Sequence, residues 1–378
     1  MDVLRIGVVG APRGRSFVRT LSSAEDAKVV SLCDIDTNLL KQVADEFDVP
    51  RMYTDYVEML DNEQLDAVII ATPMHLHVPQ SVEALKRGVN VLSEVTAAVS
   101  LRQCEELVRA CRESDAKYML AENYCYRPNV VLVQSLVERG FFGRVYFGEG
   151  EYIHDVKAMH HHAAGQPTWR AVWQVGKRGC TYCTHSLGPL ILWFQDRVES
   201  VSCHGTGVHT DPGHVMDDTV IMLCKMSKGG LLKIRLDMMS NRPHNMDYYS
   251  LQGTKGAYEA PRGLGDDHKI WVSDVSERVE WRPLREFEQY LPDKWRNPPD
   301  EARKAGHGGG DYFELRDFLD SVIKDRNPSI DVYMAMDMTL PGLVSERSIL
   351  NNGRYYTVPD LRTWDGEEPL QDLVFPVG

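Results

Sequence analysis

Two side chains in the middle of the chain, Tyr182 and His185, are suited to moving protons. They belong to the run from Cys180 to His185. The ordinary pKa of histidine is close to neutrality, so His185 could take the proton of a substrate hydroxyl, and Tyr182 could serve as a second acid or base. Removal of hydride from a secondary alcohol needs such a base beside a nicotinamide ring. These two residues form the predicted catalytic pair, although a histidine that only caps a helix start is the alternative for His185.

A turn near the N-terminus is suited to holding the pyrophosphate of a dinucleotide. It reads Gly10-Ala11-Pro12-Arg13-Gly14-Arg15-Ser16 and precedes a helical stretch. Backbone N–H groups at a helix start bind phosphates, and glycine permits the close approach. Because Pro12 replaces a usual glycine and the turn is one residue short, the motif alone is weak.

Asp34 strengthens this interpretation. It ends the second apolar run, about twenty residues after the turn, where a carboxylate binds the adenine-ribose hydroxyls and repels a 2′-phosphate. We therefore predict NAD rather than NADP as the cofactor. The alternative, that Asp34 caps the next helix, is weaker because Asp36 could fill that role.

Polar clusters also follow two later apolar runs, at Thr72 to His77 and at Ser93 to Thr96. Ligands bind at the carboxyl ends of parallel strands, so both clusters are predicted to face the cofactor. Either histidine could instead be structural, and Glu94 could neutralise a helix start. The predicted cofactor-binding residues are Gly10, Arg13, Gly14, Arg15, Ser16, Asp34, Thr72, Pro73, His75, His77, Glu94 and Asn123.

Several residues of the second half are candidates for binding a sugar. Sugar sites combine aromatic surfaces with charged or amide groups that bind hydroxyls. His307 is favoured because the glycines around it allow close backbone approach. The predicted substrate-binding residues are Trp169, Arg170, Tyr152, His154, Asn241, Arg242 and His307.

The elements that position these residues follow two patterns. Up to residue 120, short β-branched runs alternate with amphipathic helical stretches, which predicts a doubly wound parallel sheet. After residue 123, a helix and longer strands joined by turns predict an open, mostly antiparallel sheet. The fold class is thus α/β, with a Rossmann domain over residues 1–122 and a substrate and oligomerisation domain over 123–378. The predicted strands are 6–9, 29–32, 67–71, 89–92, 117–120, 198–204, 219–226 and 231–238, and the clearest helices are 128–138, 310–324 and 332–349.

Composition narrows the function classes. The 378 residues carry a net charge of -13, from 55 acidic and 42 basic side chains, which disfavours nucleic acid and anionic membranes as partners. The eight cysteines are irregularly spaced, and no export signal is recognisable, so a reducing cytoplasmic location is expected. His160 to His162 are consecutive and cannot easily converge on one metal ion, and Cys180 with Cys183 lacks a redox-protein context. No metal is predicted.

The chain resembles the Gfo/Idh/MocA family of oxidoreductases over nearly its whole length. Members join a Rossmann domain that binds NAD or NADP to an open, largely antiparallel sheet domain. The resemblance rests on the glycine turn at Gly10, Asp34, Thr72-Pro73 with His77, Glu94, the run Gly253 to Gly256, and Pro328 to Gly342.

Two departures point to one branch of that family. The usual Glu-Lys-Pro triplet is Glu94-Val95-Thr96, so the lysine that assists proton transfer is absent, and the usual aspartate falls on Thr181. Both features resemble the NAD-dependent glycosidases, such as the α-N-acetylgalactosaminidases. Shared motifs are Tyr182, His185 and Leu187 to Pro189, with Gly306 to Gly309 and Ala121 to Tyr126.

The resemblance implies oxidation of a sugar ring at carbon 3. Our first hypothesis is an NAD-dependent oxidoreductase acting on a sugar or glycoside. The alternative is a redox-neutral glycoside hydrolase, in which oxidation acidifies the hydrogen at carbon 2, the glycosidic oxygen leaves, water adds and the hydride returns. The third hypothesis is a non-catalytic protein that senses a dinucleotide or a sugar. A homo-oligomer, dimer or tetramer, is expected in each case.

Overall fold

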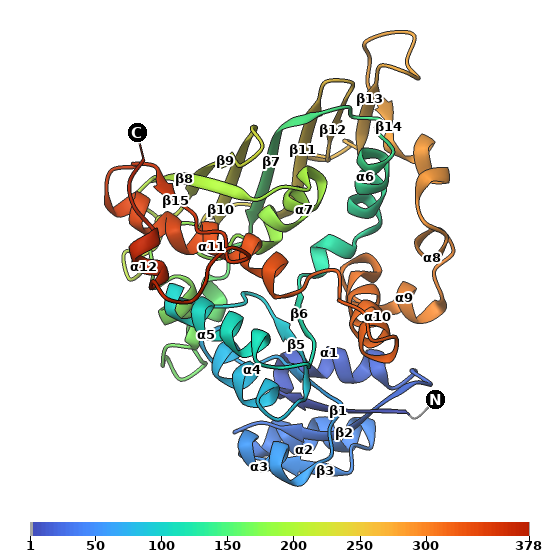
Figure 1. Cartoon of the computed structure of the whole chain (residues 1–378), viewed down its shortest axis with the longest axis vertical. Coiled ribbons are helices and arrows are strands. Elements are labelled where there is room, and N and C mark those ends of the chain that lie inside the picture. The colour runs from blue at the N-terminus through green and yellow to red at the C-terminus, as the bar shows by residue number, and fades with distance from the viewer. Residues whose placement is uncertain (1–2, 378) are drawn as a thin grey trace. The chain divides into compact units, whose positions relative to one another are not determined.

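The apolar runs of the first third form a six-stranded parallel sheet, which confirms the predicted doubly wound fold. The computed structural model of the protein describes residues 3–377 (Figure 1). The strand order is β3-β2-β1-β4-β5-β6, with the order reversing between β1 and β4 as in Rossmann sheets. The strands are β1 (Leu4–Val9), β2 (Ala27–Cys33), β3 (Arg51–Tyr53), β4 (Ala67–Ile70), β5 (Asn90–Glu94) and β6 (Tyr118–Ala121).

Helices connect these strands, and α2, α3 and α5 have side-chain caps at their starts. Asp36 accepts from the N–H groups of Asn38 and Leu39 at the start of α2, so the alternative capping role falls to Asp36 and leaves Asp34 for other partners. Ser100 caps α5 through the N–H of Gln103, as its spacing predicts. The helices are α1 (Ala11–Leu21), α2 (Thr37–Phe47), α3 (Tyr56–Asn62), α4 (His77–Leu85) and α5 (Leu101–Arg112).

The second sheet has nine strands in the order β14-β13-β12-β11-β7-β10-β9-β8-β15. Only β7 and β10 pair in parallel, so the sheet is mixed and mostly antiparallel, as predicted. The turn over residues 227–230 joins β9 to β10 as a hairpin. The strands are β7 (Val145–Ile153), β8 (Val198–Gly205), β9 (Val220–Met226), β10 (Leu231–Asp237), β11 (Asn245–Gly253), β12 (Gly256–Glu259), β13 (Lys269–Val272), β14 (Arg282–Pro283) and β15 (Tyr356–Thr357).

Helix α7 packs on one face of this sheet, against β7, β10 and β11 (Figure 1). Gly150 of β7 makes this possible, because a Cβ there would lie 2.1 Å from the carbonyl oxygen of Ser186. Within residues 3–377, no helix has the length and apolar character needed to cross a membrane. The remaining helices are α6 (Pro128–Glu138), α7 (Thr184–Phe194), α8 (Asp293–Arg296), α9 (Asp300–Lys304), α10 (Gly310–Ile323), α11 (Val332–Leu350) and α12 (Leu370–Leu373).

The chain divides into two compact units, and each unit is built from several separate segments of the sequence. The first contains residues up to Glu122 together with 300–336 and 365–367, and the second contains 123–299, 337–364 and the residues from 368 on. The first segment of this unit therefore ends at Glu122, which is also the predicted end of the Rossmann domain. It also takes in α10 from the predicted 123–378 domain, because α10 packs on α1 and β6.

Candidate active site

The glycine turn of the first unit is shaped by close backbone packing. Gly10 has φ 93°, and a Cβ there would lie 2.5 Å from the backbone carbon and oxygen of Ala71. At Gly14 a Cβ would lie 2.7 Å from a methyl group of Val8, so this glycine lets α1 approach β1. Both positions thus require glycine to keep the start of α1 beside the ends of β1 and β4.

Asp34 stands at the end of β2 with its carboxylate partly exposed. One oxygen accepts from the N–H of Ala11 at 2.7 Å and the other from the N–H of Asp36 at 2.8 Å. Each carboxylate oxygen has a second lone pair, so the group can still accept from ribose hydroxyls. The first turn of α1 carries no acidic side chain that would repel a phosphate. These features fit a bound dinucleotide.

Arg13 and Glu94 are bound to each other rather than standing free beside the turn. The Nε of Arg13 donates to the Glu94 carboxylate, and its Nη1 donates to the hydroxyl of Ser16 at 2.8 Å. Nη1 also lies 3.8 Å from Asp311 of α10. Burial disfavours the charged guanidinium, but Glu94 and Asp311 outweigh it and raise the pKa of Arg13. Arg13 and Glu94, both predicted to bind the cofactor, therefore also form an ion pair with each other.

Three other predicted cofactor residues have partners within the protein. An Nη of Arg15 lies 2.6 Å from a carboxylate oxygen of Glu46, and the hydroxyl of Thr72 donates to Gln80 at 2.6 Å. His77 is 1% exposed, and its ring nitrogens lie 2.8 and 2.9 Å from the carbonyl oxygens of Thr72 and Thr96. Its side chain therefore anchors the loop after β4, and any contribution to cofactor binding comes through that loop.

The remaining predicted cofactor residues lie at the ends of β4 and β6. Pro73 precedes a short 3-10 turn over Met74–Leu76 that contains His75. Burial, and then His77, lower the pKa of His75 below its ordinary value. Asn123 is buried and begins the second unit.

His307 belongs to the first unit, whereas the other predicted substrate residues belong to the second. Its φ is 55°, followed by 67° at Gly308 and 94° at Gly309, so this short turn is held in the left-handed region. The Nδ1 of His307 lies 2.9 Å from a carboxylate oxygen of Asp311. A non-glycine residue held at positive φ and oriented by a carboxylate is typical of a functional position.

The second unit gathers the predicted catalytic pair in a cluster of aromatic rings. Tyr182 precedes α7 and His185 lies in its first turn, with ring centroids 5.6 Å apart. Tyr152, near the end of β7, lies 5.0 Å from the His185 ring and 6.0 Å from the Tyr182 ring. Tyr124 stacks on His185 at 4.3 Å and has the Arg127 guanidinium at 4.1 Å from its ring. Sequence reasoning placed Tyr124 in a shared motif but missed it as a site residue.

His154 extends this cluster toward the loop after β10. Its Nδ1 lies 2.9 Å from the Tyr152 hydroxyl, and its ring lies 4.6 Å from that of His244. His244 is a second residue that sequence reasoning missed, although it follows the predicted Asn241 and Arg242 closely. In this loop Asn241 accepts from the Lys157 ammonium at 2.8 Å.

The other predicted substrate residues in the second unit are exposed, as Arg242 is, or half-buried, as Trp169 and Arg170 are. Arg242 is exposed and donates to the carbonyl of Pro243 at 3.3 Å. The Arg170 guanidinium stacks on Trp169, 4.4 Å from its ring, and donates to Gln174 at 3.0 Å. Arg170 is close enough to help lower the pKa of His154, which ties this pair electrostatically to the cluster.

The three consecutive histidines, His160 to His162, are not arranged as a metal site. His160 is buried and its Nδ1 lies 3.0 Å from Nε2 of His214, which is 3.1 Å from Asp211. Among residues 3–377, no three His, Cys, Asp or Glu side chains are grouped to hold a metal. Cys180 and Cys183 are buried, as packing residues beside Tyr182 would be.

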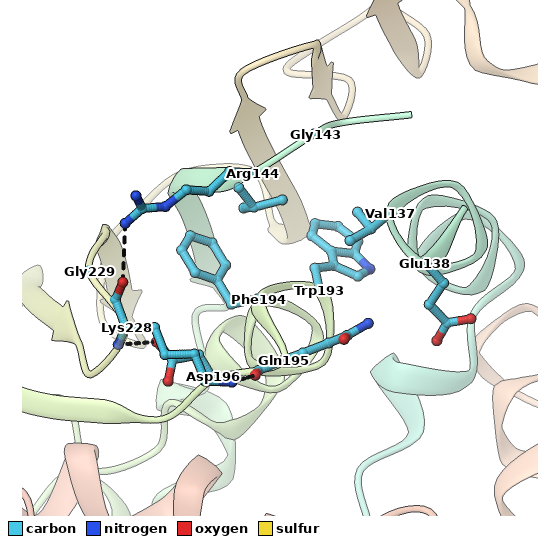
Figure 2. Close-up of a pocket in the computed structure, with 11 residues that line it drawn as sticks. Val137, Glu138, Gly143, Arg144, Trp193, Phe194, Gln195, Asp196, Lys228 and Gly229 are labelled. Atoms are coloured by element: carbon cyan, nitrogen blue, oxygen red, sulfur yellow. Dashed lines mark hydrogen bonds between the residues drawn. The ribbon is translucent and has the colours of Figure 1, made fainter. Parts of the chain in front are cut away.

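A separate pocket of about 520 Å³ lies at the C-terminal end of α7. Figure 2 shows Trp193 and Phe194 on one side and the β9–β10 hairpin on the other. Arg144 donates to the carbonyl of Lys228 at 3.1 Å, and the Lys228 ammonium donates to the carbonyl of Gln195 at 2.7 Å. No predicted site residue lines this pocket. Arg144 joins the hairpin to the segment just before β7, and Lys228 joins it to the end of α7.

A parallel sheet with a glycine turn, together with an open mixed sheet that carries a tyrosine and histidine cluster, defines a Rossmann-type oxidoreductase fold. Residues 4–122 match the oxidoreductase family with an NAD-binding Rossmann fold, and 130–259 match the Gfo/Idh/MocA C-terminal domain. Residues 204–365 match the C-terminal domain of glycosyl hydrolase 109. The chain is an enzyme whose domains match those of the Gfo/Idh/MocA family, and its C-terminal part also matches glycosyl hydrolase 109.

Individual relatives agree with this assignment. A glycosyl hydrolase family 109 protein of Parabacteroides distasonis is 29% identical, over 94% of this chain and 86% of the relative. An alpha-N-acetylgalactosaminidase of Tannerella forsythia is 27% identical, over 95% and 86% of the two chains. Among solved structures, levoglucosan dehydrogenase with NADH and levoglucosan has a TM-score of 0.79 at 19% identity, over 95% of this chain and 100% of that one. The last comparison shows a shared fold.

Proposed function

We propose that this protein is a redox-neutral glycoside hydrolase that uses NAD as a recycled cofactor. The first hypothesis, net oxidation of a sugar, gives way to its alternative because the C-terminal match and the relatives are those of glycosyl hydrolase 109. We further propose an α-linked N-acetylgalactosamine glycoside as the substrate, since the relative from Tannerella forsythia is named for that activity.

The observation that carries the proposal is the number of proton-handling groups in one cluster. Net dehydrogenation needs one base for one hydroxyl proton, and the lysine that serves in ordinary family members is absent at Val95. Elimination and rehydration also move protons at carbon 2, at the glycosidic oxygen and at the added water. His185 and Tyr182, with ring centroids 5.6 Å apart, can divide these tasks.

The residues of the chain would act in sequence. Asp34 and the start of α1 would hold the dinucleotide, and NAD, when bound, would supply a temporary acceptor for the hydride of carbon 3. His185 would take the proton of the carbon 3 hydroxyl, and Tyr182 would serve as the acid or base for the carbon 2 proton and the leaving oxygen. Water would then add across carbons 1 and 2, the hydride would return to carbon 3 and His185 would return its proton to the carbon 3 oxygen, so the sum is hydrolysis without net NADH.

The test is to incubate the protein with NAD and p-nitrophenyl α-N-acetylgalactosaminide and to record nitrophenol and NADH in the same cuvette. Nitrophenol release without accumulating NADH is the expected result. Stoichiometric NADH with a keto-sugar and no nitrophenol would instead establish the oxidoreductase. A panel of other p-nitrophenyl glycosides, run in parallel, tests the sugar assignment separately from the reaction type.

We also propose that the face of the nine-stranded sheet opposite α7 forms a subunit interface. Glu149 alternates along β7 with Gly148 and Gly150, which face α7, so its side chain points to the opposite face. There its carboxylate lies 3.1 Å from Lys233 and 3.5 Å from Arg262. A broad, half-buried face with paired charges suits a homo-oligomer. The cytoplasmic location remains a prediction.

A further inference from the structure

The aromatic cluster contains a hydrogen bond between the side chains of Tyr152 and His154. Tyr152 is 6% exposed, and its hydroxyl lies 2.9 Å from Nδ1 of His154. The Tyr152 ring is a neighbour of both Tyr182 and His185, at 6.0 and 5.0 Å. His154 therefore bonds to a tyrosine that borders the predicted catalytic pair.

The direction of this hydrogen bond follows from the charge of His154. Burial, and then His244, Arg170 and His185, lower the pKa of His154 to about 4, against a small opposing effect of Asp155. The ring is therefore neutral at pH 7 and has one N–H and one nitrogen lone pair. A phenol is a stronger donor than a neutral imidazole, and imidazole nitrogen is a stronger acceptor than a phenol oxygen. Tyr152 should donate and His154 Nδ1 should accept.

We propose that His154 is a positioning residue that binds the Tyr152 proton and so makes the Tyr152 oxygen a dedicated hydrogen-bond acceptor for the substrate. A tyrosine has one hydroxyl proton, and once His154 accepts it the oxygen presents only lone pairs to a ligand. The site would then select a sugar that offers a hydroxyl or an amide N–H at this point. This inference rests on the proposed function for the identity of the ligand as a sugar.

Three variants separate this role from a structural one. His154→Leu removes the acceptor, whereas His154→Asn keeps an amide oxygen near the position of Nδ1. Tyr152→Phe removes the hydroxyl that His154 is proposed to orient. With p-nitrophenyl α-N-acetylgalactosaminide, we expect kcat/KM to fall about tenfold in His154→Leu, the effect of one lost hydrogen bond, and mainly through KM. His154→Asn should recover at least a third of the wild-type value.

A double variant tests whether His154 acts through Tyr152. In the Tyr152→Phe background, adding His154→Leu should change kcat/KM by less than about twofold, because the hydroxyl to be oriented is already gone. A further tenfold loss would show that His154 contacts the substrate directly and would overturn the proposal. Equal losses in His154→Leu and His154→Asn would overturn it as well.

The chain offers a matched control pair. The Tyr258 hydroxyl lies 2.8 Å from Nδ1 of His268, and this pair stands on β12 and beside β13, where no predicted site residue lies. His268→Leu removes the same kind of bond, so it should lower the melting temperature comparably and leave KM unaffected. If His268→Leu raises KM as much as His154→Leu does, the effect is general destabilisation and the proposal fails.

A spectroscopic measurement keeps the inference independent of turnover. In protein labelled with nitrogen-15 histidine at pH 7, His154 should show a protonated Nε2 and a hydrogen-bonded, unprotonated Nδ1, and the Nδ1 signal should shift in Tyr152→Phe. A protonated Nδ1 would refute the proposal. If the wild-type protein releases no nitrophenol, the proposed function fails, while this spectrum still decides the direction of the Tyr152 to His154 bond.

Discussion

Glu314 provides a direct test of the electrostatics at the start of α10. The residue is 0% exposed, and neither carboxylate oxygen has a hydrogen-bond partner within the described part of the chain. Burial, and then Asp311 and Glu94, raise the pKa of Glu314 well above its ordinary value, although Arg13 opposes them. We therefore expect Glu314 to keep its proton in the folded protein to a higher pH than an exposed glutamate does.

Glu314→Gln imitates the protonated carboxyl without being able to ionise. In the unfolded chain the pKa of a glutamate is about 4.3, so above that pH the wild type must take up a proton to fold. Its free energy of unfolding therefore falls as pH rises from about 4.3 toward the folded pKa, by about 1.4 kcal/mol for each pH unit. Glutamine has no such loss. Because the folded pKa is raised, the variant should gain stability over the wild type as pH rises from 5 toward 7, by at most about 1.4 kcal/mol for each pH unit.

Thermal or urea unfolding at pH 5, 6 and 7 measures this difference. A gain of that size corresponds to a rise of roughly 2–4 °C in melting temperature for each kcal/mol. The exposed Glu25, in the same unit, supplies the control, because Glu25→Gln should follow the wild type at every pH. Parallel curves for wild type and Glu314→Gln would mean that Glu314 is ionised in the folded protein and would refute the reasoning.

Three further predictions concern the proposed site and assembly. His185→Ala should lower kcat for nitrophenol release by roughly a hundredfold to ten-thousandfold, and NAD titration followed by tryptophan fluorescence should show that the cofactor still binds. Asp34→Ala should weaken NAD binding and reduce the preference for NAD over NADP, measured by the same titration, because its carboxylate selects against a 2′-phosphate. Ile221 is 36% exposed on β9, so Ile221→Lys should lower the mass measured by light scattering if this sheet face is the subunit interface.

The Rossmann part of the fold could be predicted because its signals are local. Each predicted strand lies within two residues of the observed one, since buried parallel strands are continuous apolar runs. Helices α10 and α11 also begin at the predicted residues. The strand β7 was missed, because Gly148 and Gly150 weaken its strand pattern and are explained only by the close approach of α7.

The site could be predicted only in part, because the partners of its side chains are far apart in sequence. Arg13 and Glu94 each matched a cofactor motif, but nothing in their local sequence indicates that they pair across 81 positions. His244 was missed for a similar reason: only the fold brings it to His154. The alternative capping role of Asp36 could be foreseen, since an N-cap depends on residues two or three positions away.

The two units differ in the kind of chemistry that their side chains can support. In the first unit, Arg13 is surrounded by Glu94, Asp311 and Glu314, so the arginine is fixed and can exchange no proton. In the second unit, Tyr182 and His185 have ring centroids 5.6 Å apart and carry groups of the kind that can both give and take a proton. The proposed hydrolysis needs such groups, because protons move at carbon 2, at the glycosidic oxygen and at the added water as well as at the carbon 3 hydroxyl.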